Sequence, residues 1–91
     1  MAVTVRVPMI LRDYTAGAAE VEAAGATVAQ VLDDLEARHP GIRGRIVDEA
    51  GVLRRFMNVY VGNDDVRYLD DLATATPDGS QVSVIPSVAG G

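Results

Sequence analysis

The strongest constraint on the fold of this 91-residue chain is a pair of alternating, valine-rich segments near its two ends. In residues 3–8 three valines alternate with Thr, Arg and Pro, and residues 81–86 also begin with alternating valines. Alternation places apolar side chains on one face of an extended strand, so both segments are expected to be half-buried β-strands. Residues 18–24 and 56–61 alternate too and predict two more strands. A short edge strand is expected at residues 66–68.

Between the two predicted hairpins lies one amphipathic helix. Residues 27–30, Thr-Val-Ala-Gln, are typical of a capping box at a helix start. Four apolar residues then recur at i, i+3, i+4 and i+7, which predicts a stripe facing the core. They are Val28, Val31, Leu32 and Leu35. Pro40-Gly41 is expected to end the helix, and residues 42–48 to form a short second one.

Two hairpins flanking a helix predict an α+β chain with the β-grasp (ubiquitin-like) fold. We expect a mixed sheet of four to five strands, with one main helix packed on one face. The helix serves as the right-handed crossover, so that the first and last strands pair in parallel at the sheet centre. One domain is predicted at residues 1–86, followed by a flexible C-terminal tail at residues 87–91.

Composition excludes several function classes. The chain has no cysteine, so it has no disulfide and no thiol chemistry. Its net charge is −5, with eight bases that are all arginine, which argues against nucleic acid as a partner. The acidic balance serves either solubility or steering onto a basic partner. No apolar run approaches the ~20 residues that span a bilayer, and no signal peptide is evident, so we expect a cytoplasmic protein without membrane contact.

The C-terminus is the main candidate for chemistry. The chain finishes on Val88, Ala89, Gly90 and Gly91, directly after the last predicted strand. Glycine has no Cβ, so this end can enter a slot too narrow for a side chain. The α-carboxylate of Gly91 is unshielded, and another protein could activate it and pass it to a nucleophile. A cloning remnant or a frayed end is the alternative interpretation.

Other candidate residues carry less weight. His39, the only histidine, lies in the last helical turn, where a cation suits the helix dipole. The pairs Asp33-Asp34, Asp64-Asp65 and Asp70-Asp71 lack the ligand spacing of a calcium loop and are interpreted as solvated surface. We therefore predict no catalytic residue, no metal site and no bound cofactor, and expect that the chain is not an enzyme.

Three apolar residues are candidates for partner docking. If the valines face the helix, then Phe56, Tyr60 and Ile85 lie on the opposite sheet face, beside the tail. An apolar patch there would be a docking surface. The alternative is that residues 9–17 cover Phe56 and Tyr60.

Residues 71–91 resemble the end of the ThiS/MoaD sulfur-carrier proteins, where an Asp-Gly turn precedes the last strand and a proline-led tail finishes in Gly-Gly. Further segments resemble the CysO branch of that family. They are Ile10-Leu11-Arg12 with Thr15 and Gly17, Asp34-Leu35-Glu36-Ala37 with Gly41-Ile42, and Asn58-Val59-Tyr60-Val61 with Asp65-Val66-Arg67.

The resemblance implies that Gly91 is the site of adenylation and of thiocarboxylate formation. A MoeB/ThiF-like partner enzyme would use ATP and Mg²⁺ to adenylate the carboxylate, and a sulfur source would then displace AMP. Residues 87–91 would reach about 17 Å into the partner's active site. The sulfur would pass to an acceptor enzyme, either a pyridoxal-phosphate-dependent cysteine synthase or another sulfur-incorporating synthase. The free carrier is expected to be a monomer.

Two alternatives remain open at this point. The chain could be a ubiquitin-like modifier that is joined through Gly91 to target lysines. It has no lysine, so it could not build lysine-linked chains on itself. It could also be a plain β-grasp interaction module, in which case its tail would be dispensable.

Overall fold

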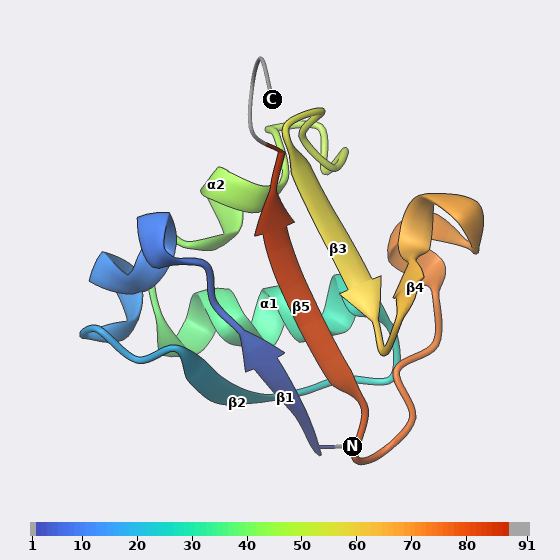
Figure 1. Cartoon of the computed structure of the whole chain (residues 1–91), viewed down its shortest axis with the longest axis horizontal. Coiled ribbons are helices and arrows are strands. Elements are labelled where there is room, and N and C mark those ends of the chain that lie inside the picture. The colour runs from blue at the N-terminus through green and yellow to red at the C-terminus, as the bar shows by residue number, and fades with distance from the viewer. Residues whose placement is uncertain (1, 88–91) are drawn as a thin grey trace.

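The fold of the chain is a mixed β-sheet with a helix across one face (Figure 1). The computed structural model describes residues 2–87. Five strands form the sheet in the order β2-β1-β5-β3-β4. They are β1 (Ala2–Arg6), β2 (Glu20–Ala24), β3 (Met57–Val61), β4 (Asp64–Asp65) and β5 (Gln81–Pro86). The predicted β-grasp fold is confirmed.

The strand β5 occupies the centre of the sheet because both hairpins leave one edge for it. It pairs in parallel with β1, with Val5 opposite Val82, and antiparallel with β3, with Val59 opposite Val84. The predicted parallel pairing of the first and last strands is therefore confirmed. The C-terminal end of β5 lies at the same end of the sheet as the start of β3 (Figure 1).

Two α-helices connect the halves of the sheet, α1 (Val28–Arg38) and α2 (Arg43–Ile46). The Thr27 hydroxyl caps α1 by accepting from the Gln30 backbone N–H at 3.3 Å, as the capping box predicts. The Gln30 side chain accepts from the N–H of Ala26, one residue before the cap, at 2.8 Å. After α1, the carboxylate of Glu36 accepts backbone hydrogen bonds from Gly41 and Arg43, which lower the pKa of Glu36.

The core lies between α1, α2 and one face of the sheet. All four residues of the predicted helical stripe are buried, as are alternate residues of the central strands. The fully buried side chains include Val5, Val28, Val31, Leu35, Ile46, Val59 and Val82. This packing explains the alternation in the sequence, since the other strand positions face away from the helix.

Three short 3₁₀ helices complete the described part of the chain: η1 (Met9–Thr15), η2 (Val66–Tyr68) and η3 (Asp71–Ala73). The expected edge strand at residues 66–68 is wrong, because this segment is η2 and the edge strand is β4. The reason is local: the Asp65 carboxylate accepts the backbone N–H of Arg67 at 2.9 Å, which turns the chain instead of extending it. Residues 9–15, which show no sustained period in the sequence, coil into η1.

Candidate functional site

The C-terminal end of β5 is where the tail leaves the folded body. Ser87, the first residue after β5, donates its backbone N–H to the carbonyl of Phe56 at 2.7 Å. We call the region formed by Phe56, Asn58, Pro86 and Ser87 the tail exit. The predicted site residues Val88, Ala89, Gly90 and Gly91 lie outside the described residues. The division into residues 1–86 and 87–91 stays a prediction.

A chain of side-chain hydrogen bonds holds Ser87 at the tail exit. The Asn58 Nδ2 group donates to the Ser87 hydroxyl at 2.8 Å, and Arg67 Nη1 donates to Asn58 Oδ1 at 2.7 Å. Arg67 Nη2 also donates to the carbonyl of Arg54 at 2.7 Å. Because Arg67 occupies the amide oxygen of Asn58, the amide nitrogen must face Ser87. The position of Ser87 is thus set by residues of β3 and η2.

Pro86 lies at the end of β5, where the side of the strand that faces β1 is no longer paired. The Gly62 N–H binds the Gln81 carbonyl, and the Ser87 N–H binds Phe56, so the odd-numbered residues of β5 direct their backbone groups toward β3. The even-numbered ones therefore face β1, whose register with β5 ends at Arg6 and Ser83. Pro86 has no N–H, so no backbone donor is left unpaired where β1 has turned away.

Two of the predicted docking residues, Phe56 and Ile85, line different hollows. Tyr60 lies opposite Ser83, and Ile85 lies opposite Asn58, which puts Tyr60 and Ile85 on the sheet face away from the helix. Ile85 is 46% exposed and Phe56 is 53% exposed, while Tyr60 is half-buried. Phe56 precedes β3 and lines a separate cleft. A docking role for these three residues stays a prediction.

Two hollows flank the tail exit. A cleft of about 510 Å³ lies between η1, α2 and the start of β3, and its lining includes Tyr14, Arg45 and Phe56. A groove of about 280 Å³ lies between the end of β1 and β5, and its lining includes Arg12 and Ile85. In the cleft Ile10 on η1 and Phe56 are both more than half exposed, so η1 does not cover Phe56.

Asn58 and Arg67 were missed as site residues by sequence reasoning. Arg67 is nine positions from Asn58, and Asn58 is 29 positions from Ser87, so no local pattern connects the three. Only the pairing of β3 with β5, together with the turn at η2, brings them together. Asn58 offered one indirect signal, because it is a polar residue in the outward register of an alternating strand.

Within residues 2–87, no helix has the length and apolar character needed to cross a membrane. In the same part of the chain, His, Cys, Asp and Glu side chains form no cluster that could hold a metal ion. As far as the described residues go, the candidate site is the tail exit with its anchoring hydrogen bonds and the two flanking hollows.

Comparison with known proteins matches the ThiS family over residues 5–91. The chain belongs to the ThiS family. It is 48% identical over 93 residues to the sulfur carrier protein CysO of Mycobacterium tuberculosis, covering all of both chains. Another relative is small archaeal modifier protein 3 of Haloferax volcanii, which is 46% identical over 66 residues, covering 72% of this chain and 71% of the relative.

Among solved structures, the ThiS-family chain resembles one from the crystal structure of the Amycolatopsis orientalis BexX/CysO complex. The TM-score is 0.92 and the identity 49%, covering 98% of this chain and 99% of the other. The resemblance to the ThiS/MoaD family, and to its CysO branch, is thereby confirmed.

Proposed function

We propose that this chain is a sulfur carrier whose Gly91 carboxylate is converted to a thiocarboxylate. The observation that carries the proposal is the full-length match, at 48% identity, to a protein named as a sulfur carrier. The structure supports it with a tail exit at the rim of the folded body, where Ser87 is held and four residues follow. Fully extended, four residues reach about 14 Å.

The chemistry follows from the properties of a carboxylate, which is a poor electrophile because its charge repels nucleophiles and oxide is a bad leaving group. A carboxylate oxygen of Gly91 attacks the α-phosphorus of ATP, and pyrophosphate leaves. Sulfide then attacks the acyl carbon, and AMP leaves with that oxygen. The product is an anionic thiocarboxylate that differs from the starting chain by one sulfur in place of one oxygen.

The partner enzymes supply the catalysis in this proposal. A MoeB/ThiF-like enzyme holds ATP and Mg²⁺ and adenylates Gly91, and this chain itself binds no cofactor and is not an enzyme. The acceptor is a pyridoxal-phosphate-dependent cysteine synthase or another sulfur-incorporating synthase. The exposed Phe56 and Ile85, together with Tyr60, are the proposed docking residues. The free carrier is a cytoplasmic monomer that binds neither nucleic acid nor membrane.

Intact mass spectrometry tests the proposal. After incubation with the cognate activating enzyme, ATP, Mg²⁺ and sulfide, the mass should rise by one oxygen-to-sulfur exchange. A chain that lacks Gly91 should keep its fold and show no shift. An unchanged mass of the intact chain, with an enzyme that adenylates it, would contradict the proposal.

A second function, protein modification through Gly91, is favoured by the similarity to small archaeal modifier protein 3. The two functions share the adenylated intermediate and differ in the nucleophile that attacks it. Conjugates that survive thiol and hydroxylamine treatment would indicate isopeptide bonds to target lysines. Thiocarboxylate formation without such conjugates would support the carrier function and exclude the modifier function.

A further inference from the structure

Within residues 2–87, the eight arginines of the chain fall into two groups, those that form an ion pair with a carboxylate and those that do not. Three form ion pairs: Arg6 with Glu20 at 3.8 Å, Arg38 with Asp34 at 2.8 Å and Arg43 with Asp33 at 3.0 Å. The other five have no carboxylate within ion-pair distance among residues 2–87. They are Arg12, Arg45, Arg54, Arg55 and Arg67, and we call them the arginine collar.

Four collar arginines are held in place by neutral acceptors. Arg12 Nε donates to the Val7 carbonyl at 3.1 Å, and Arg54 Nε donates to the Gly44 carbonyl at 2.9 Å. Arg45 Nε donates to the Tyr14 hydroxyl at 2.8 Å, a bond that raises the pKa of Arg45. Arg67 binds Asn58 and Arg54, as described above. Each of these bonds fixes a guanidinium without neutralising its charge, so the positive charge is preorganised.

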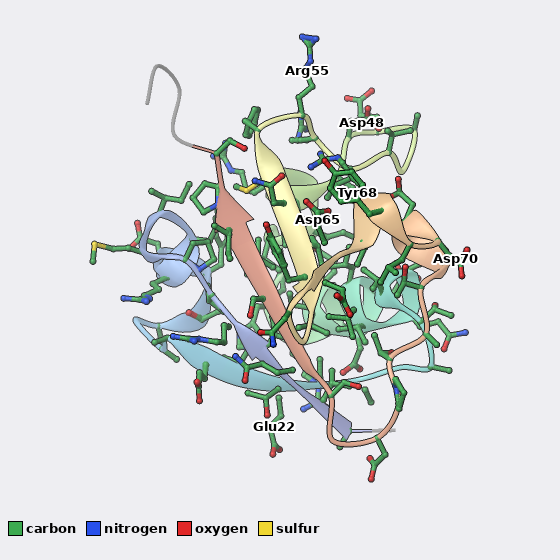
Figure 2. All side chains as sticks on the ribbon, turned by 45° about the vertical axis from the view of Figure 1, so that its right-hand side comes forward. Glu22, Asp48, Arg55, Asp65, Tyr68 and Asp70 are labelled. Atoms are coloured by element: carbon green, nitrogen blue, oxygen red, sulfur yellow. The ribbon has the colours of Figure 1, made fainter. Side chains whose placement is uncertain are left out.

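The collar arginines line the hollows beside the tail exit or are linked to its residues. Arg45 and Arg54 line the cleft shared with Phe56, and Arg12 lines the groove shared with Pro86. Arg67 reaches Ser87 through Asn58, and Arg55 precedes Phe56 in the chain. Figure 2 shows Arg55 projecting from this end of the molecule, whereas Glu22 and Asp70 project from other sides.

The acids at this end offset the collar only in part. Asp13 lines the same cleft as Arg45, and Asp48 and Glu49 lie beside Arg54, but none approaches an arginine within ion-pair distance. The Asp48 carboxylate accepts from the backbone N–H groups of Ala50 and Val52 at 2.9 and 3.0 Å, and it keeps its negative charge. The five collar arginines outnumber these three acids, so a chain with net charge −5 has a local excess of positive charge around the tail exit.

The geometry points to the collar as a docking ring for an acidic protein surface, namely acidic side chains around the channel of the enzyme that receives the tail. This inference rests on the proposed function. Charge complementarity of this kind speeds the encounter and fixes orientation. The negative remainder of the chain would be repelled by the same acidic surface, so the tail end would approach first. The collar would thus orient the carrier so that its tail end faces the enzyme.

A matched pair of double variants tests the collar. Arg45→Glu with Arg54→Glu reverses two collar charges. Arg38→Glu with Arg43→Glu makes the same change in net charge at two ion-paired positions that line neither hollow. The readout is kcat/KM for thiocarboxylate formation by the cognate activating enzyme. At low salt we expect at least a tenfold loss, roughly, for the collar pair and less than about a threefold loss for the control pair.

Salt and conservative substitution sharpen the test. The wild-type kcat/KM should fall about tenfold between roughly 50 mM and 0.5 M salt, and the collar pair should lose most of this dependence. Arg45→Lys with Arg54→Lys should stay within about threefold of wild type because the charges remain. Thermal unfolding checks that each variant folds. Glutamine versions of both pairs repeat the comparison for any glutamate variant that does not fold.

Equal losses in the collar and control pairs would overturn the inference, as would a wild-type rate that salt does not change. Calorimetry measures the affinity of each variant for the same enzyme even when no thiocarboxylate forms. A failure of the proposed function is therefore distinguished from a failure of the collar inference. Salt-sensitive self-association, or binding to a labelled DNA oligonucleotide, that the collar substitutions abolish would assign the collar to another occupant and would also overturn the inference.

Discussion

The helix-covered face of the sheet and the tail end of the molecule differ in how they use their side chains. On the covered face Val5, Val59 and Val82 are fully buried against the helix, which stabilises the fold. At the tail end Phe56 and Ile85 remain about half exposed, and within residues 2–87 the collar arginines have no carboxylate at ion-pair distance. The difference teaches that stability and recognition are located in separate regions, so substitutions should affect one without the other.

The largest effect is expected on the covered face. Leu35→Ala removes a side chain that is 0% exposed and should lower the free energy of unfolding by about 2–5 kcal/mol, through lost burial and a residual cavity. The matched control is Leu69→Ala, since Leu69 is 49% exposed, and should cost no more than about 0.5 kcal/mol. Urea unfolding measures both. Similar losses at the two leucines would break the comparison.

At the tail end, an aromatic substitution should affect binding more than stability. Phe56→Ala should raise the KM for the activating enzyme about tenfold, because aromatic anchors dominate interface energy. Tyr68→Ala, at a residue that is 87% exposed on η2, is the control and should leave the KM unchanged. Steady-state charging kinetics give both values. An unchanged KM for Phe56→Ala would exclude this residue from the docking surface.

The anchoring of the tail should give a smaller effect. Asn58→Leu breaks the bonds to Ser87 and Arg67, and should lower kcat/KM for charging about threefold to tenfold because a freed residue must be ordered again on binding. Asn58→Asp should restore it, since a carboxylate can accept from both the Ser87 hydroxyl and Arg67. The backbone ¹⁵N order parameter of Ser87 should fall only in the leucine variant.

A matched serine pair controls for the anchoring effect. Ser87→Ala removes the hydroxyl that Asn58 binds, whereas Ser80→Ala makes the same change in the turn before β5, away from the tail exit. Only Ser87→Ala should slow charging, and Ser87→Thr should not. An identical rate for Ser87→Ala and wild type would show that Asn58 does not position the tail.

The smallest effect concerns pH. Backbone hydrogen bonds lower the pKa of Glu36 in the folded state, so its contribution to stability is present above the unfolded-state pKa and is lost as pH falls through the folded one. Glu36→Gln should therefore unfold at a lower temperature than wild type at pH 7, and the difference should shrink at pH 3 (about a unit below the usual range of a glutamate). A constant difference in melting temperature would contradict this assignment.

The sequence predicted the fold well where one physical signal dominates. The buried face is indicated by the alternating valines of β1 and β5, and by the apolar stripe from Val28 to Leu35. The segment 66–68 failed because two interpretations compete: Val66 and Tyr68 alternate like a strand, yet the Asp65 side chain binds the Arg67 N–H and starts a turn. A short segment has too few residues for its period to outweigh one such bond.

The site was only partly predictable for a related reason. The terminal glycines can be read directly, but the arginine collar depends on which arginines find a carboxylate after folding. Arg38 meets Asp34 one helical turn away, whereas Arg45 meets Tyr14, 31 positions distant in the sequence. Neutral anchors of this kind are set by tertiary packing, so the sequence shows the number of charges without showing where they remain unpaired.

The central place of β5 has a consequence for biosynthesis on the ribosome. Every other element is translated earlier, yet β1 and β3 share no neighbour until β5 lies between them. A nascent chain can therefore complete its sheet only after the strand leading into the tail has been made. A chain whose synthesis stops before β5 cannot form this sheet. An enzyme that recognises the folded body would therefore not bind such a fragment.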